Sequence, residues 1–295
     1  MASNELRNKT ELTSVTGDEW VYVQDNLTPF TVKKVQIDTI AAYAGLGEIV
    51  GKTPEYTITD IDAVKRVEVD TTAGDITITL PLLANNIGRR IEIANVKGGT
   101  NKVIISPNAT DANKLSSDAL NVICLPKVGD YVIFQQSSIS GYWEIVGESI
   151  TSQLRLNTYA GYGSTETKIM RFTNSVENIG NMFSENHSTG YSSNAKGLEI
   201  TINRSGIYSF DYNYNTNTVS NGGISLNSSE LTTSIISVSV GTRIANVVIL
   251  AGGNTSECSA TMYFKKNDVI RPHTDGVSGS TYASFNTFTV SYIGQ

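Results

Sequence analysis

Apolar and polar residues alternate along most of this 295-residue chain, in short runs spaced about ten residues apart. Period-two alternation turns one side of each run toward a core, which is the pattern of half-buried β-strands. Turn-forming pairs such as Gly98-Gly99, Ser140-Gly141 and Gly222-Gly223 separate the runs. The pattern requires no long helix, and it predicts an all-β protein.

The runs fall into two groups. Those within residues 53–150 predict a small β-sandwich or barrel module. Those within residues 167–295, among them the apolar stretch 235–240, give at least eight candidate strands and predict a C-terminal jelly roll. Residues 151–166 lose the alternation and are expected to form a connector, with Gln153, Leu154 and Leu156 as an alternative start of the next strand.

The first 52 residues hold too little apolar material to fold alone. Short strand-like runs occur near residues 20–23 and 31–35, and residues 37–43 have the spacing of one or two helical turns. We therefore expect a short N-terminal segment, 1–52, that a larger partner orders. The candidate anchoring residues are Trp20, Tyr22, Val32, Val35 and Ile37.

The charge balance argues against two classes of partner. The net charge is −6, whereas nucleic acid and anionic membranes both require a basic footprint. Residues 151–295 carry 9 of the 22 basic and 9 of the 28 acidic residues, so the C-terminal half is neutral. A neutral surface favours packing of the C-terminal half against other copies of the same chain over capture of a charged ligand.

Neither the N-terminus nor any apolar run indicates a membrane. Residues 1–13 lack the apolar stretch of a secretory signal. The longest apolar run, 244–251, is far shorter than the ~20 residues of a membrane span. We expect a soluble protein without membrane insertion, made without Sec-type export.

Residues that could carry chemistry are few. Cys124 and Cys258 lie in separate apolar runs and are expected to be buried free thiols, and His187 and His273 are expected at the surface or in turns. These four residues offer no zinc ligand set, so no metal or cofactor is expected.

The sequence contains residue pairs of catalytic type, but no catalytic motif accompanies them. His273 with Asp275, or His187 with Ser188, lacks a nucleophile elbow. The carboxylate pairs Asp60 with Asp62 and Glu257 with Asp268 could serve glycoside hydrolysis, but solvated strand-edge and turn acids explain them as well. We expect a protein that is not an enzyme, with a glycan-cleaving spike as the alternative.

Three short motifs mark the C-terminal segment: residues 206–210 (GIYSF), 264–270 (FKKNDVI) and 288–294 (FTVSYIG). They resemble the trimeric jelly-roll heads of the tumour necrosis factor and complement superfamily. Asn267 stands where that family usually has Gly, and both residues tolerate the left-handed conformation. The resemblance implies a homotrimer around a threefold axis.

The aromatic residues agree with self-association, because the segment holds more of them than one small core is expected to hide. The predicted threefold contact consists of Tyr208, Phe210, Tyr212, Tyr263 and Tyr292.

The rest of the chain resembles parts of bacteriophage fibres. Residues 71–81, 88–93 and 141–147 are similar to the small β modules of phage head and tail fibres, and residues 21–37 to their virion-attachment ends. The resemblance implies a virion structural protein, a head or tail fibre or capsid decoration subunit, made in the host cytoplasm. Its N-terminus would bind capsid or tail proteins, and distal loops would bind host surface polysaccharide through Tyr191 and Tyr282.

Overall fold

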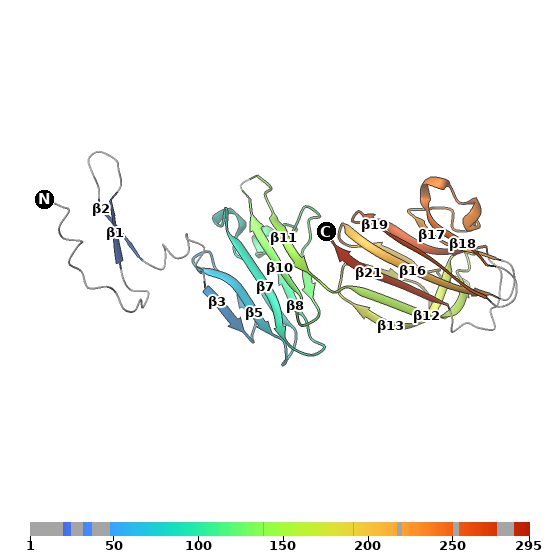
Figure 1. Ribbon diagram of the computed structural model, residues 1–295, viewed down its shortest axis with the longest axis horizontal. Coiled ribbons are helices and arrows are strands. Elements are labelled where there is room, and N and C mark those ends of the chain that lie inside the picture. The colour runs from blue at the N-terminus through green and yellow to red at the C-terminus, as the bar shows by residue number, and fades with distance from the viewer. Residues whose placement is uncertain are drawn as a thin grey trace.

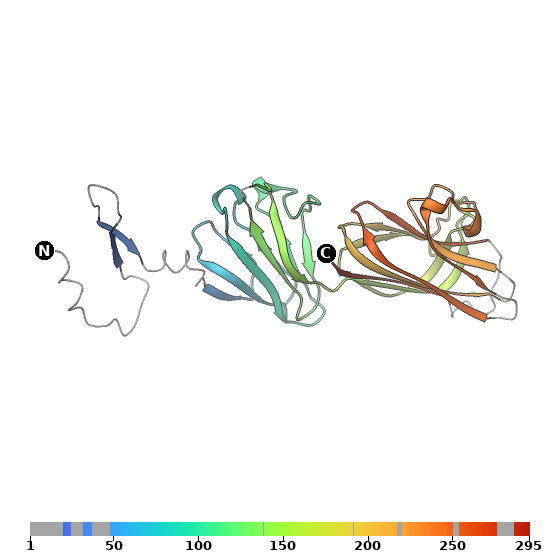
Figure 2. The same cartoon turned by 45° about the horizontal axis from the view of Figure 1, so that its top comes forward.

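The computed structural model describes residues 20–24, 32–36, 48–137, 139–190, 192–216, 220–249, 254–275 and 286–295. Within these residues the chain forms strands and short 3-10 turns without any α-helix, which confirms the all-β prediction. No helix in this part of the chain has the length and hydropathy of a membrane span. Two β modules lie end to end, and the C-terminus lies where they meet (Figures 1 and 2).

An N-terminal hairpin carries most of the candidate anchoring residues. Strand β1 (Trp20–Gln24) pairs antiparallel with β2 (Val32–Gln36), so that Trp20 stands opposite Gln36. Trp20 and Tyr22 belong to β1, and Val32 and Val35 belong to β2. Ile37 and the expected helical turns lie outside the described residues. The anchoring role of this hairpin stays a prediction.

The first module, β3 to β11, consists of a five-stranded sheet in the order β11-β10-β7-β5-β3 and a four-stranded sheet in the order β4-β6-β8-β9. Its strands are β3 (Glu48–Lys52), β4 (Tyr56–Thr57), β5 (Val64–Asp70), β6 (Ile76–Thr79), β7 (Arg90–Lys97), β8 (Val103–Ser106), β9 (Ile123–Leu125), β10 (Tyr131–Gln136) and β11 (Trp143–Ser149), with 3-10 turns η1 (Leu83–Asn85) and η2 (Ala109–Asp111).

Several strand pairs of this module are parallel, although the sequence pattern alone did not indicate them. Strands β3, β5 and β7 run parallel in one sheet, and β4, β6 and β8 run parallel in the other. A parallel pair needs a crossover, and here each crossover is a strand of the opposite sheet, since the chain alternates between the sheets from β3 to β8. The two sheets enclose a core that is almost entirely aliphatic.

The second module, β12 to β21, is a sandwich of two five-stranded antiparallel sheets. Their orders are β13-β12-β21-β16-β19 and β14-β15-β20-β17-β18. Ten strands in two antiparallel layers, with the last strand in the middle of a sheet, give the predicted jelly roll. The bounds are β12 (Gln153–Tyr162), β13 (Met170–Ile179), β14 (Phe183–Asn186), β15 (Glu199–Ile202), β16 (Gly206–Thr216), β17 (Ser220–Leu226), η3 (Ile235–Ser237), η4 (Val240–Thr242), β18 (Arg243–Ile249), β19 (Asn254–Phe264), β20 (Val269–Thr274) and β21 (Thr287–Gly294).

Two details of the jelly roll explain residues of the sequence motifs. Gly206 enters β16 against the ring of Tyr292, where an added Cβ would lie 2.6 Å from Cε2. Asn267 adopts φ 72°, the left-handed conformation expected at this turn.

Three segments differ from the sequence expectation. Gly222 and Gly223, expected to form a turn, lie inside β17, where Gly223 leaves room for Ile235. The alternative strand start at Gln153 is confirmed: within the expected connector 151–166, residues 153–162 form β12, which pairs with both β13 and β21. Bulges interrupt its register with β13, and each bulge breaks the period-two pattern by which a strand is recognised. The apolar stretch 235–240 forms 3-10 turns instead of a strand, with Ile235 and Val238 buried three positions apart.

Candidate assembly site at the module junction and the outer sheet face

Most of the predicted threefold contact residues lie inside the protomer. Tyr208, Phe210, Tyr212 and Tyr292 point into the sandwich and are at most 7% exposed. These side chains are therefore not accessible to a neighbouring copy, which corrects the prediction for all four. Tyr263 is 53% exposed, and its place at a threefold contact stays a prediction.

One large sandwich hides more aromatic rings than the sequence argument allowed. Tyr208 packs edge-on against Phe264 and Tyr292, and Phe210 packs edge-on against Phe264. The Tyr208 hydroxyl donates to the carbonyl of Arg204 at 2.6 Å and can reach that of Met182 at 3.0 Å. Burial raises the pKa of Tyr208, so the hydroxyl stays protonated.

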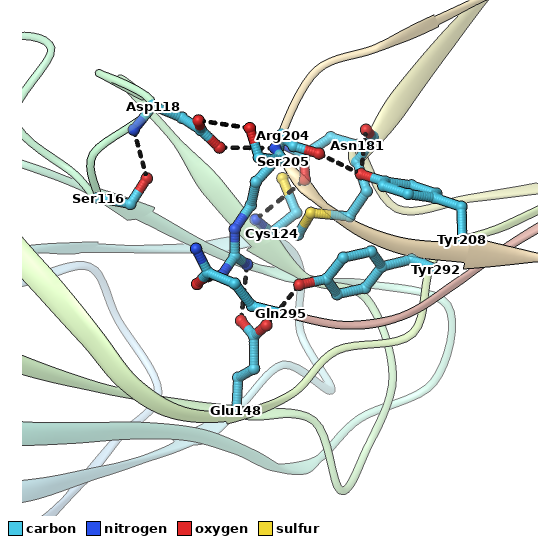
Figure 3. A network of polar contacts seen from close by, with 11 residues as sticks. Ser116, Asp118, Cys124, Glu148, Asn181, Arg204, Ser205, Tyr208, Tyr292 and Gln295 are labelled. Atoms are coloured by element: carbon cyan, nitrogen blue, oxygen red, sulfur yellow. Dashed lines mark hydrogen bonds and ion pairs between the residues drawn. The ribbon is translucent and has the colours of Figure 1, made fainter. Parts of the chain in front are cut away.

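A buried ion pair joins the two modules (Figure 3). Glu148, near the end of β11, places Oε2 2.6 Å from Nη1 of Arg204, in the turn before β16. The side chains of Arg204 and Glu148 are 1% and 8% exposed. Removing one member of a buried pair leaves an unpaired charge, at a cost of about 3–5 kcal/mol. The pair therefore ties the orientation of one module to the other.

Two further groups complete the surroundings of this ion pair. The Tyr292 hydroxyl donates to Oε1 of Glu148 at 2.5 Å, and Nη2 of Arg204 donates to the side-chain carbonyl of Gln295 at 2.9 Å. The Arg204 guanidinium also lies 5.6 Å from the centre of the Tyr292 ring. Burial raises the pKa of Tyr292, and the Glu148 carboxylate adds to the effect, so the hydroxyl remains a donor. We call these four residues the junction clamp.

A second connection runs through Asp118 of the first module. Its carboxylate accepts from the backbone N–H of Ser205 at 2.6 Å and from the Ser205 hydroxyl at 2.7 Å. Lys266 donates from Nζ to the Asp118 carbonyl at 2.7 Å. The loop that carries Asp118 holds Ser116 and Ala119 at φ 56° and 54°. Left-handed non-glycine residues are costly and are retained where a fixed geometry is needed.

Weaker contacts surround the two connections. Asn181 accepts from the backbone N–H of Cys124 at 3.4 Å, and Lys127 lies 3.6 Å from Glu177 in an exposed ion pair. Exposed pairs contribute only about 0–1 kcal/mol, so the buried groups dominate the junction.

The outer face of the sheet β13-β12-β21-β16-β19 is polar in its centre, where it includes charged side chains, and apolar near the junction. Strand register aligns Arg155, Thr289, Asp211 and Ser259 in one row across four strands. At the junction end, Ile207, Tyr263 and Ile293 are 38%, 53% and 60% exposed. Ile207 stands directly opposite Tyr263. We call these three residues the apolar end patch.

The other candidate residues do not form a shared site. Tyr191 and Tyr282 lie outside the described residues, so glycan binding at the distal loops stays a prediction. Cys124 and Cys258 are buried free thiols, as predicted. Burial raises the pKa of the Cys258 thiol to about 12, which makes it unreactive.

Both histidines have surroundings other than the combinations considered. His187 lies 3.4 Å from the Glu185 carboxylate, and the Ser188 hydroxyl accepts from the backbone N–H of Lys196 at 2.9 Å. His273 is fully buried on β20, which corrects its expected surface or turn position. The physical reason is that the segment carrying Glu230, Thr233 and η3 covers this face of the sheet, since Gly223, opposite His273, abuts Ile235. Asp275 instead accepts hydrogen bonds from Ser220 and Asn221.

The carboxylate pairs have structural partners. Asp60 accepts from Asn85, Asn86 and the backbone of Leu82. Asp268 accepts from Asn227 and the backbone of Lys265. The pKa of Asp60 is lowered, chiefly by the hydrogen bond from Asn85. Within the described residues, no cluster of His, Cys, Asp and Glu is suited to a metal ion.

Sequence reasoning missed the junction clamp and the Asp118 connection because their residues are far apart in sequence and carry no motif of their own. Arg204 and Glu148 are separated by more than fifty residues, and Asp118 lies in a polar loop. The one available signal was a charged residue, Arg204, two positions before the strand-like run 206–212 in a weakly charged region.

No family model matches the sequence, and no curated protein matches it. Solved structures of murine APRIL at pH 8.5, 8.0 and 5.0 are similar to it at 11% sequence identity, with TM-scores of 0.33, 0.33 and 0.32. Each covers 48% of this chain and 99% of the APRIL chain. The likeness is distant and concerns the jelly roll of the C-terminal half, which is established here by the strand order and register of this chain.

Proposed function

We propose that this protein is a structural subunit of a bacteriophage virion, a head or tail fibre or a capsid decoration protein. The observation that carries the proposal is the end-to-end coupling of two β modules through the buried Glu148–Arg204 pair. A fibre subunit has to keep its modules aligned while it extends from the particle. The N-terminal hairpin would bind capsid or tail proteins, and the jelly roll would face outward.

The proposed subunit acts as a homotrimer through the outer face of the sheet β13-β12-β21-β16-β19. The apolar end patch supports the proposal, because association of copies through it buries apolar surface. Tyr263 is the one residue of the predicted contact that remains available. A tyrosine is well suited to an interface that is partly wet.

The proposed role is not catalytic. Asp60 and Asp62 both have a lowered pKa, although a general acid needs a raised one. A glycan-cleaving spike is the alternative, and it predicts that the purified protein lowers the viscosity of capsular polymer. A fall in viscosity that is lost in carboxylate variants would replace the structural role with the enzymatic one.

The proposal is tested by locating the chain in purified virions. Antibody against the jelly roll should label the particle surface in electron micrographs, and mass spectrometry should detect the chain in intact particles at a fixed stoichiometry. Labelling confined to the lysate, with particles free of the chain, would overturn the virion role.

A further inference from the structure

A cavity of 470 Å³ lies at the module junction, between β11 and the end of β21. A second hollow of 370 Å³ shares Glu148 and Gly294 with it and continues along residues 149–153. Both volumes lie in the range of about 300–1,000 Å³ that small-molecule sites occupy. The two hollows form one trough, whose walls come from different modules and are held in place by the junction clamp.

The floor of the trough is the edge of β11 that faces away from β10. The Trp143 backbone bonds away from β10, donating to Lys114 and accepting from Ser116. By strand alternation the N–H and C=O of Ile145 point the same way. Within the described residues no backbone hydrogen bond occupies these two groups. A donor and an acceptor side by side suit a ligand that carries hydroxyl groups.

The same edge is poorly shaped for an added peptide strand. The register between β10 and β11 shifts at Val146, which is 44% exposed, and Gly147 follows. A bulge interrupts the regular spacing that strand addition needs and blunts the edge. A polyhydroxylated ligand has no such need for register.

The side chains around the trough favour a neutral ligand. Tyr142 presents a half-buried ring, and Glu144 presents a half-buried carboxylate beside it. Gln295 adds an amide, and Ser116 and Ser117 add hydroxyls. No lysine or arginine is among the described residues that line either hollow. Carboxylate, amide and hydroxyl groups bind sugar hydroxyls, whereas an anionic polymer would be repelled.

We propose that the junction trough binds an oligosaccharide of neutral or amino sugars, with one ring stacked on Tyr142 and its hydroxyls bonded to Glu144 and the β11 edge. The inference deepens the proposed function, on which it rests for the identity of the sugar as a host-surface glycan. It places the glycan site at the junction and assigns no role in it to Tyr191 or Tyr282.

The test uses the full chain on an array of neutral and amino-sugar oligosaccharides, followed by saturation-transfer NMR titration of those that bind. Tetragalacturonate serves as the anionic probe, and a peptide of alternating valine and threonine serves as the strand probe. Tyr142→Ala should weaken oligosaccharide binding by up to about tenfold, which corresponds to about 1.4 kcal/mol and is near the upper end of what one aromatic contact contributes. Tyr142→Phe should keep most of the affinity, and Glu144→Gln should lose about threefold.

The matched control is Glu55→Gln, a change of the same charge at an exposed position of the same module, which should leave binding unchanged. Binding of no array member, or binding that survives both Tyr142→Ala and Glu144→Gln, would overturn the inference. Preference for tetragalacturonate or for the peptide would do the same. None of these results bears on the virion role, because particle labelling tests that role independently.

Discussion

The two β modules bury the same kind of period-two strands around very different cores. The first module encloses aliphatic side chains with Phe134 and Trp143 as its buried aromatic residues among those described, whereas the second stacks tyrosine and phenylalanine rings. Aliphatic side chains have no polar atoms, but each buried tyrosine hydroxyl needs a partner. The second core therefore has polar contacts that reach outside it, and the Tyr292 hydroxyl uses one to bind Glu148 of the first module.

This difference shows how a core can take part in assembly without being exposed. The rings of Tyr208 and Tyr292 stabilise the sandwich, while the Tyr292 hydroxyl and the nearby Arg204 hold the junction. Aromatic residues that the sequence assigned to contacts between protomers instead support a contact between modules of one protomer.

Phe210→Ala should show the largest difference in stability between the two modules. The side chain is fully buried, and its loss should lower the free energy of unfolding of the second module by about 3–5 kcal/mol. Hydrogen exchange should then accelerate from β12 to β21 and stay slow in the first module. Ile93→Ala is the matched change in the aliphatic core and should show the reverse. Equal loss of protection in both modules after either change would show that the chain has one core and not two.

Glu148→Gln should break the link between the modules. It leaves the Arg204 guanidinium buried without a counter-charge, at a cost of about 3 kcal/mol in unfolding free energy. Lys127→Gln, which removes the exposed pair with Glu177, should cost less than about 1 kcal/mol. Equal effects of the two changes in chemical denaturation would contradict a dominant role for the buried pair.

Acid should weaken the second module through His273, because this histidine is fully buried on β20. Burial lowers the pKa of His273 to about 4, below its value of 6.5 in an unfolded chain. The unfolded state therefore binds more protons between these values, so stability is full above pH 6.5 and falls as the pH drops toward 4. The loss should reach about 3 kcal/mol, and His273→Gln should flatten this part of the pH profile. An unchanged profile in the variant would exclude His273 as the cause.

Tyr292→Phe keeps the ring and removes only the hydroxyl that reaches Glu148. Loss of a hydrogen bond to a charged group should cost about 2 kcal/mol in unfolding free energy. Backbone exchange at residues 144–148 should accelerate, while that of the sandwich core stays slow. If exchange changed only in the core, the hydroxyl would be a local contact and not a connection between modules.

Tyr263→Ser should affect the folded protomer least. Its exposure predicts a change in unfolding free energy within about 0.5 kcal/mol, yet the concentration at which the trimer dissociates should rise. Ile139→Ser, at a 93% exposed position of the first module, is the control and should leave dissociation unchanged. Identical dissociation of both variants would remove the apolar end patch from the interface.

Period-two burial could be read from the sequence because it depends on local alternation. The runs around Val67, Ile78 and Phe210 lie in strands with their apolar side inward. Strand β12 was less visible because bulges near Leu156 and Tyr159 break the alternation. The destination of Tyr208 and Tyr212 could not be read, since alternation shows which side of a strand is apolar but not whether a sheet or a second protomer covers it. The Glu148–Arg204 pair depends on the placement of two modules, which no local pattern encodes.

Sedimentation equilibrium of the full chain at micromolar concentration tests self-association, the central claim, most directly. The account predicts a mass three times that of the 31.8 kDa protomer. A mass of one protomer across the micromolar range would contradict it.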